Sequence, residues 1–349
     1  MRSKLDDLSL VSKIDSSNML GVVDNFPNAF TGRSREVGAE PKRPAVQRLV
    51  LMGMGGSASA GDVVSNWLSR DLQVPIFVQR EPELPGYVNS KTLFVAISYS
   101  GDTSETLSAF RAAESRHASL VGVGTGGKLA GLCKAFRAPF VSVESSVAPR
   151  AALGQLIVAL AAVLESYNLV RSTSREIAEA GRELAGLRGR VRAENPMERN
   201  PAKRLASQLL GRFLVVYSLQ RMAAVARRFK NQLAENCKSV SKFDLLPESC
   251  HNEIEAWKTY PSRSLPLIVR DSQESKFESA SIKAFKSIIS QQTRVRPVEV
   301  MVPMRGRLSR LVGPIFFLDY VSVYLALLKQ TNPTPTESIA KYKVLLKTS

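Results

Sequence analysis

The sequence predicts an α/β protein that contains two doubly wound parallel sheets with flanking helices. Short apolar runs alternate with amphipathic stretches of helical length, which is the pattern of strands joined by helices in a parallel sheet. This alternation begins twice, because Pro196 and Pro201 interrupt it and a new apolar run follows them. The chain has 349 residues, more than one hydrophobic core usually supports. We therefore divide it into two units, residues 1–190 and 191–349.

The first unit opens with one or two short helices over residues 4–24, where Leu5, Leu8 and Val11 recur at helical spacing. Residues 25–45 are polar and rich in Gly and Pro, so we expect a connector. An alternation of strands and helices follows and predicts the first sheet. Its strands cover residues 48–54, 75–79, 92–98, 120–124 and 138–144, and its helices cover residues 57–68, 103–116 and 149–167.

The second unit follows a charged helix over residues 173–195 and repeats the alternation. Pro333 and Pro335 separate its last two helices, because proline cannot continue a helix in its interior. The predicted strands are 212–218, 265–270 and 297–302, and the predicted helices are 219–235, 313–329 and 335–347.

The formal net charge of +17 raises the question of a nucleic-acid partner. The basic residues are spread along the chain, however, and their densest cluster, 221–230, lies inside an amphipathic helical pattern. No basic stripe interleaved with aromatic residues is present. We therefore expect no nucleic-acid partner and interpret the charge as a surface that favours small anions.

Cysteine usage and the N-terminal sequence indicate a cytoplasmic protein. Cys133, Cys237 and Cys250 are odd in number, far apart and without CxxC spacing, which fits a reducing compartment. The first residues lack the apolar core and cleavage site of a signal peptide. We also find no apolar stretch of the roughly 18 residues that a membrane span needs, so we expect no membrane association.

Two Ser/Gly-rich turns stand at strand ends and indicate a phosphate site. The first, GMGGSASAGD (53–62), lets the backbone approach a ligand and opens a helix whose N–H groups are free. It lacks the final glycine and the acidic residue of a dinucleotide fingerprint. The second, SYSGDTSET (98–106), carries several hydroxyls within one turn, with Asp102 or Thr103 available to cap the next helix. Two such turns at the carboxyl ends of strands in one sheet predict a phosphorylated ligand.

Three further residues are candidates for chemistry on that ligand. Arg150 opens a helix, where a cation opposes the helix dipole, so a role in anion binding would explain it. Glu235 ends a helical pattern and His251 follows sixteen residues later; a carboxylate and an imidazole are groups that proton transfer at a sugar carbon requires. A solvated arginine, a surface carboxylate and a polar histidine contact are the ordinary alternatives.

Other chemistries find little support. Two scattered histidines and three scattered cysteines give no zinc-ligand spacing, and no GxSxG elbow follows a strand. We expect neither a metal nor another cofactor.

The ordered motifs resemble those of the bifunctional phosphoglucose/phosphomannose isomerases of the sugar-isomerase (SIS) superfamily. The resemblance runs from about residue 45 to the C-terminus. It implies two SIS-type, flavodoxin-like subdomains, the first with the phosphate loops and the second with the catalytic residues. The matching segments are GMGGSASAGD, SYSGDTSETL, APRAALGQL (148–156), NPAKRLASQLLGR (200–212), ARRFKNQLAENCK (226–238) and PESCHNEIEAW (247–257).

The resemblance assigns roles to particular residues. It implies Glu235 as catalytic base, His251 as the ring-opening histidine donated by the neighbouring subunit of a homodimer, and Arg150 as the arginine near the reacting carbons. The implied substrate-binding residues are Gly56, Ser57, Ser98, Ser100 and Thr103.

The C-terminal segment NPTPTESIAKYK (332–343) matches the family pattern less closely. It selects Lys343 as the lysine that assists ring opening, with Lys341 as the alternative, because Asn332, Thr336 and Tyr342 depart from the pattern. Thr334 or Thr336 is expected to help create room for the substrate, and Thr336 is our choice. Two more departures, Asp102 and Cys250, each replace a usual Asn outside the transferred roles.

These roles imply a metal-independent aldose–ketose isomerase that interconverts glucose 6-phosphate and mannose 6-phosphate with fructose 6-phosphate through a cis-enediol. A non-catalytic sugar-phosphate sensor would need only the loops, so Glu235 and His251 argue against it. An amino-sugar phosphate isomerase shares the loops and stays open, although the sequence shows no N-terminal nucleophilic cysteine with which to make ammonia.

Overall fold

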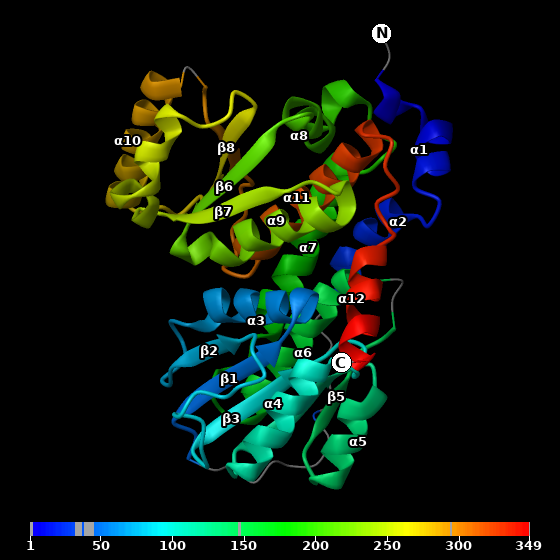
Figure 1. Cartoon of the computed structure of the whole chain (residues 1–349), viewed down its shortest axis with the longest axis vertical. Helices are drawn as coiled ribbons and strands as arrows, with labels where there is room; N and C mark the ends of the chain where they lie inside the picture. Colours follow the sequence, from blue (N-terminus) through cyan, green and yellow to red (C-terminus); the bar gives the residue numbers. More distant parts are fainter. Residues whose placement is uncertain (1–2, 32–36, 38–44, 146–147, 294, 349) are drawn as a thin grey trace.

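The computed structural model describes residues 3–31, 37, 45–145, 148–293 and 295–348. Two α/β lobes are stacked along the long axis of the molecule, each with its own sheet (Figure 1). Helices α3, α6, α7, α9 and α11 lie between and beside the sheets (Figure 1). The predicted fold class, two doubly wound parallel sheets with flanking helices, is therefore confirmed.

The first lobe contains a five-stranded parallel sheet in the order β2-β1-β3-β4-β5. This 2-1-3-4-5 order is the flavodoxin-like one, and its switch point lies between β1 and β3. The elements of this lobe are β1 (Arg48–Gly53), α3 (Gly55–Leu68), β2 (Ile76–Gln79), β3 (Thr92–Ile97), α4 (Ser104–Ser115), β4 (Ser119–Gly124), α5 (Gly127–Ala135), β5 (Phe140–Ser142), the 3-10 helix η3 (Pro149–Ala152) and α6 (Leu153–Ser166).

The second lobe repeats the winding with four parallel strands in the order β7-β6-β8-β9. Its elements, with the linking helix, are α7 (Ser174–Val191), η4 (Met197–Arg199), α8 (Pro201–Leu209), β6 (Phe213–Leu219), η5 (Gln220–Met222), α9 (Ala223–Cys237), β7 (Ser241–Leu246), η6 (Glu248–His251), η7 (Glu253–Lys258), β8 (Ser264–Arg270), α10 (Lys276–Thr293), β9 (Val298–Met301), α11 (Ser309–Leu328) and α12 (Glu337–Thr348).

The N-terminal helices pack on the second lobe, although they precede the first sheet in the chain. These are η1 (Lys4–Asp6), α1 (Leu8–Ile14), α2 (Met19–Asp24) and η2 (Phe26–Ala29). The fully buried Lys203 of α8 donates from Nζ to the Leu5 carbonyl at 2.8 Å and to Asp6 Oδ1 at 2.9 Å. Phe26 stacks on Phe316 of α11. Residues 25–45 were expected to form a connector; η2 occupies its start, and most of the remainder, 32–36 and 38–44, lies outside the described residues.

Among the α-helices and strands of the described residues, four were missing from the sequence prediction: α5, α8, β7 and α10. Strand β7 is an edge strand, SKFDLL, whose middle residues are only partly buried, so it lacks the long apolar run of a central strand. Helix α10 buries only Ile282, Phe285 and Ile289, a narrow stripe at helical spacing within a polar segment.

One continuous core passes through both lobes, and helix α11 lies at its centre. Residues from β1, β3, α3 and α6 share this core with residues from β6, β8, α9 and α11. The expectation that no stretch has the length and apolarity of a membrane span was wrong. Residues 149–166 and 309–328 meet that test with mean hydropathies of 1.3 and 1.9, and 67% and 94% of them are buried inside the fold. Burial of this extent is what a core helix shows, since all-round apolarity suits a helix that is packed on every side.

Candidate functional site

The two Ser/Gly-rich turns leave neighbouring strands at the same edge of the first sheet. Strands β1 and β3 pair along their length, with Gly53 opposite Ile97 at their ends. The Tyr99 N–H of the second turn donates to Ser57 Oγ of the first at 3.3 Å. A Cβ on Gly53 would lie 3.0 Å from the Ile97 carbonyl oxygen, so glycine permits this close approach. The predicted convergence of the two turns at the switch point is therefore present.

Both turns lead into helices whose N-termini point toward this edge. Neither α3 nor α4 has a side-chain cap among the described residues, so their first N–H groups are available to an anion. Gly55 has a φ of 51°, a conformation that favours glycine. A Cβ on Gly56 would lie 3.3 Å from the Arg150 Cα, so the first turn packs directly on η3.

The hydroxyl groups of the second turn divide into two kinds. Ser98 is fully buried, and its Oγ donates to Thr103 Oγ1 at 3.0 Å. Ser98 therefore orders the turn, whereas the side chain of Ser100 is exposed and that of Thr103 is half-buried.

The expected cap of α4 is not formed in the way the sequence suggested. Thr103 occupies the N-cap position without a side-chain cap bond among the described residues, and Asp102 Oδ1 instead accepts from the Lys128 N–H at the start of α5, at 3.2 Å. Gly101 has a φ of 75°, and a Cβ there would lie 1.9 Å from the Gly126 carbonyl oxygen. The second turn is thus fixed against the next strand–helix turn of the sheet.

Arg150 is buried between the lobes and connects them. Its Nε donates to Asn236 Oδ1 at 3.1 Å, and its Nη2 donates to the carbonyls of Pro333 at 3.0 Å and Thr334 at 3.1 Å. Its Nη1 lies 3.5 Å from Glu235 Oε2. Burial lowers the pKa of the Arg150 guanidinium, and the nearby Glu235 carboxylate opposes that effect. The planar guanidinium is satisfied by groups from two separate segments, the end of α9 and residues 333–334, which fixes its position.

The Glu235 carboxylate lies beside the Arg150 guanidinium and is partly exposed to solvent. Its side chain is 24% exposed and lies at the C-terminal end of α9, facing the Arg150 cation. Lys238, which follows the helix in a left-handed conformation, donates from Nζ to the carbonyls of Glu235 and Pro335. Burial, followed by the nearby Arg150 charge, lowers the Lys238 pKa. The end of α9 is thereby tied to the segment that precedes α12.

The C-terminal segment contacts Arg150 through the backbone carbonyls of Pro333 and Thr334. Its two candidate lysines lie farther along the chain, on α12. The Thr334 carbonyl accepts from Arg150, and its buried Oγ1 has no hydrogen-bond partner among the described residues. Thr336, our choice from sequence, is half-buried at the start of α12, where its carbonyl accepts from the Ala340 N–H. Lys341 and Lys343 are both exposed on α12, which runs from the second lobe toward the first (Figure 1).

His251 lies elsewhere in the second lobe. It ends η6, beyond the carboxyl end of β7, and is exposed. Glu235 precedes the amino end of the same strand, whose six residues span about 20 Å. One chain therefore does not bring His251 to Glu235 and Arg150.

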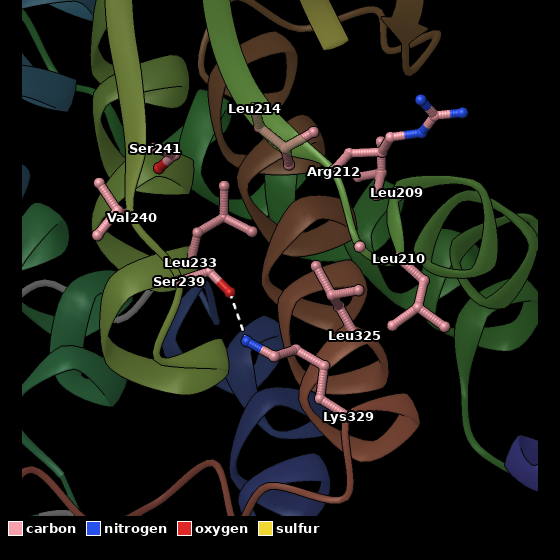
Figure 2. Close-up of a pocket in the computed structure, with 11 residues that line it drawn as sticks. Leu209, Leu210, Arg212, Leu214, Leu233, Ser239, Val240, Ser241, Leu325 and Lys329 are labelled. Atoms are coloured by element: carbon pink, nitrogen blue, oxygen red, sulfur yellow. Dashed lines mark hydrogen bonds between the residues drawn. The ribbon is translucent and has the colours of Figure 1, made fainter. Parts of the chain in front are cut away.

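A pocket at the opposite edge of the second sheet contains none of the predicted residues. It has a volume of about 230 Å³ and lies at the amino ends of β6 and β7. Figure 2 shows its leucine-rich lining and the 2.7 Å hydrogen bond from Lys329 Nζ to Ser239 Oγ. Its position away from the carboxyl ends of the strands argues against an α/β ligand site.

Sequence reasoning missed the residues that hold Arg150 in place. Asn236 and Pro333 contact it directly, and Arg228 donates from Nη2 to the Arg150 carbonyl at 3.1 Å. Arg228 is itself paired with Asp319 of α11, from Nη2 to Oδ2 at 2.6 Å. These are long-range contacts that no local pattern encodes, although an Asp inside an apolar helix was a signal that a cation lies nearby.

Comparison with known proteins places this fold and site in a class and then in a family. Residues 45–158 match the SIS domain, and residues 198–346 match the bacterial phospho-glucose isomerase C-terminal SIS domain. The structure is similar to that of a glucose-6-phosphate isomerase like protein from Thermus thermophilus, with a TM-score of 0.65 at 19% identity over 96% of this chain and 99% of that one. The two lobes are therefore SIS domains, the class that the paired sheets and phosphate-type turns define.

The sequence relatives specify the family. The chain is 33% identical to the bifunctional phosphoglucose/phosphomannose isomerase of Caldicellulosiruptor bescii, over 87% of this chain and 91% of that protein. It is 31% identical to the protein of the same name from Aquifex aeolicus, over 93% of this chain and 97% of that protein. The chain belongs to the family of bifunctional phosphoglucose/phosphomannose isomerases, which are aldose–ketose isomerases.

Proposed function

We propose that this protein interconverts glucose 6-phosphate and mannose 6-phosphate with fructose 6-phosphate, using Glu235 as base and Arg150 as electrostatic stabiliser. One observation carries the proposal: an unbroken set of contacts joins the phosphate-type turn to both groups. Gly56 packs on Arg150, and Arg150 contacts the Glu235–Asn236 end of α9. A sugar phosphate anchored at the first lobe would thus meet a cation and a carboxylate from the lobe boundary.

The phosphate would bind at the N-termini of α3 and α4, with the hydroxyls of Ser100 and Thr103. Two uncapped helix N-termini and their partial positive charges suit a dianion. Ser57 and Ser98 would set the shape of the turns from behind, because each is buried in the contacts between or within them.

The chemistry is a proton transfer between C2 and C1. Glu235 takes the C2 proton, the C2–H electron pair forms the C1–C2 double bond, and the carbonyl oxygen takes up the negative charge of a cis-enediolate. The O2–H proton passes to O1, the C2–O2 bond becomes the carbonyl, and returning the abstracted proton to C1 gives the ketose. Arg150, prearranged by its own hydrogen bonds, stabilises the charge as it develops. Either C2 epimer yields the same enediol, and room for rotation beside Thr336, our choice, or Thr334, the alternative, would admit both aldoses.

His251 would open the sugar ring in the site of a partner subunit. The distance along β7 separates His251 from Glu235 of its own chain, so a site with both groups needs a second copy. We therefore propose a homodimer with two shared sites, each built from Glu235 of one subunit and His251 of the other. From its cysteine usage, we also propose that the protein is cytoplasmic.

One of two lysines on α12 would assist ring opening. Lys341 and Lys343 are two residues apart, which places them on nearly opposite faces of a helix. Only one of them can face a given site. We keep Lys343 as the proposed residue, and comparing Lys343→Ala with Lys341→Ala decides between them: a selective loss of activity in Lys341→Ala would reverse the assignment.

The decisive assay measures isomerisation of both aldose 6-phosphates in the presence of EDTA. Glu235→Gln is expected to lower kcat by about 10²- to 10⁴-fold, the usual contribution of a general base. The exposed Glu198→Gln is the matched control and should behave as wild type.

Activity that EDTA abolishes, or an unaffected Glu235→Gln enzyme, would contradict the metal-free mechanism. Activity on glucose 6-phosphate alone would contradict dual specificity, and binding without turnover would favour a sensor. Turnover of an amino-sugar phosphate instead would favour the third alternative.

Mixing two inactive variants tests the shared site. Glu235→Gln and His251→Ala dimers that exchange subunits should recover about a quarter of wild-type activity, because one site in four then has both groups intact. If each chain used its own His251, no site in the mixed dimer would be complete and no activity would return.

A further inference from the structure

A second cavity lies between the lobes, at the carboxyl ends of strands β6, β7 and β8. Its volume is about 780 Å³, within the range of small-molecule sites. Arg221 follows β6, Pro247 follows β7 and Asp271 follows β8, and all three line it. The order β7-β6-β8-β9 reverses direction between β6 and β8, so the cavity is at the switch point of the second sheet, where α/β folds bind ligands.

This cavity repeats the construction of the first-lobe site with the lobes exchanged. The first-lobe site uses the turns after β1 and β3 together with the C-terminal end of α9. The cavity uses the turns after β6 and β8 together with the C-terminal end of α3, residues 65–70. Asn66 joins the two helices by donating to the Gln220 carbonyl at 3.3 Å and accepting from the Ala224 N–H at 3.0 Å. The two sites therefore lie at opposite ends of the α3–α9 pair.

The lining of the cavity is rich in arginine. Four arginines and two carboxylates contribute to it: Arg70, Arg221, Arg307, Arg310, Asp271 and Glu278. Arg221 is engaged by Glu278 at 2.6 Å, and Arg307 by Glu176 and Asp71 outside the cavity. Arg70 is exposed and forms no ion pair within the part of the chain that the structure describes. The cavity thus retains cationic groups that its own carboxylates do not neutralise.

Arg310 has a buried side-chain nitrogen without a hydrogen-bond partner among the described residues. Its side chain is only 21% exposed, and its nearest carboxylate oxygen, Asp271 Oδ1, is 3.6 Å from Nε. That buried nitrogen is Nε. A buried N–H donor without a hydrogen-bond partner is destabilising. A guanidinium with five donors in a planar fork matches phosphate or carboxylate oxygens, which would remove that destabilisation.

We propose that this cavity is a second anion site, which takes a small phosphate ester through Arg310 and Arg70. Phe277, 75% exposed and part of the lining, covers the organic portion of the ligand. Neither Glu235 nor the serine turns belong to this site, so it is independent of the catalytic proposal.

Equilibrium dialysis of the full-length protein with phenyl phosphate, which carries both a phosphate and an aromatic ring, tests the proposal. Wild type is expected to bind two molecules per chain, one at the serine turns and one in the cavity. Arg310→Leu combined with Arg70→Leu should bind one, and Ser100→Ala combined with Thr103→Val should bind the other. Arg263→Leu, an exposed arginine before β8, is the matched control and should retain two.

Two further measurements keep the outcome clear. The single Arg70→Leu change, at an exposed residue that does not threaten folding, should weaken the second binding event about tenfold, as expected for loss of one charged contact of about 1.4 kcal/mol. Isomerase activity should survive the loss of the cavity site. Binding that is unchanged in the Arg310→Leu/Arg70→Leu protein, whether wild type binds one molecule or two, would overturn the proposal. A single wild-type binding event that this double variant abolishes and that Ser100→Ala/Thr103→Val retains would support the cavity site, even if the serine turns bound nothing and the catalytic proposal failed.

Discussion

The buried Arg228–Asp319 ion pair should decide both the stability of the lobe boundary and the position of Arg150. The two side chains are only 4% and 6% exposed. Arg228 donates to Asp319 from Nε and Nη2, at distances between 2.6 and 3.3 Å, and also donates to the Arg150 carbonyl. Removing one partner leaves the other charge buried without compensation.

The magnitude follows from that burial. Breaking a buried pair by removing one partner costs about 3–5 kcal/mol, whereas replacing both with apolar residues is often neutral. We therefore expect Arg228→Met and Asp319→Leu each to lower the free energy of unfolding by about that amount, and the double variant to regain most of it. The double variant still leaves the Arg150 carbonyl without its donor. A displacement of Arg150 of about 1 Å would lower kcat/KM by up to about 10²-fold.

Guanidinium denaturation at one fixed protein concentration and isomerase kinetics supply the two readouts. Fixed concentration matters because association would itself add apparent stability. Each single variant costing less than about 1 kcal/mol, as solvent-exposed pairs do, would refute the reasoning. Recovery of stability together with full activity in the double variant would show that the Arg228 contact does not position Arg150.

Three further predictions concern the second turn and the thiols. Gly101→Ala should destabilise the turn and weaken phosphate-ester binding at least tenfold, because a Cβ there meets the Gly126 carbonyl oxygen at 1.9 Å. In the native protein a thiol reagent should label Cys250 first, because Cys133 and Cys237 are buried and burial raises the pKa of both thiols to about 12. The stability advantage of wild type over Cys237→Ala should be complete below about pH 8.5 and shrink by up to about 1.4 kcal/mol per pH unit as pH rises toward 12, since the unfolded thiol loses its proton first.

Each of these has its own control and its own contrary result. Gly86 has open space around it, so Gly86→Ala should leave phosphate-ester binding unchanged; equal effects of the two alanines would contradict the steric argument. Labelling of all three thiols at similar rates would contradict their burial. Denaturation curves at about pH 8 and about pH 10.5, on either side of the ordinary thiol pKa, measure the Cys237 effect. An advantage that stays constant between them would show that the buried thiol is not held protonated.

The sequence determined the fold class and the phosphate turns because both depend on local chemistry. Apolar runs of strand length alternate with helical patterns, and this predicted each of the central strands that the structure describes. The glycines and hydroxyls of each turn are adjacent in the chain, so their clustering is visible in the sequence itself. Edge strand β7 and helix α10 escaped because their apolar stripes are short or narrow, and only packing shows which side is buried.

The roles of individual polar residues depended on tertiary structure, because they rest on contacts between distant segments. The sequence offered several hydroxyls in the second turn, yet burial separates Ser98, which orders the turn, from the exposed Ser100 and the half-buried Thr103. Arg150 stood as a lone cation at a helix start; the structure surrounds it with α9 and the 333–334 segment. The separation of Glu235 from His251 likewise depends on tertiary structure, because strand β7 lies between them. Local chemistry thus determined which residues were available, and long-range packing decided which of them meet.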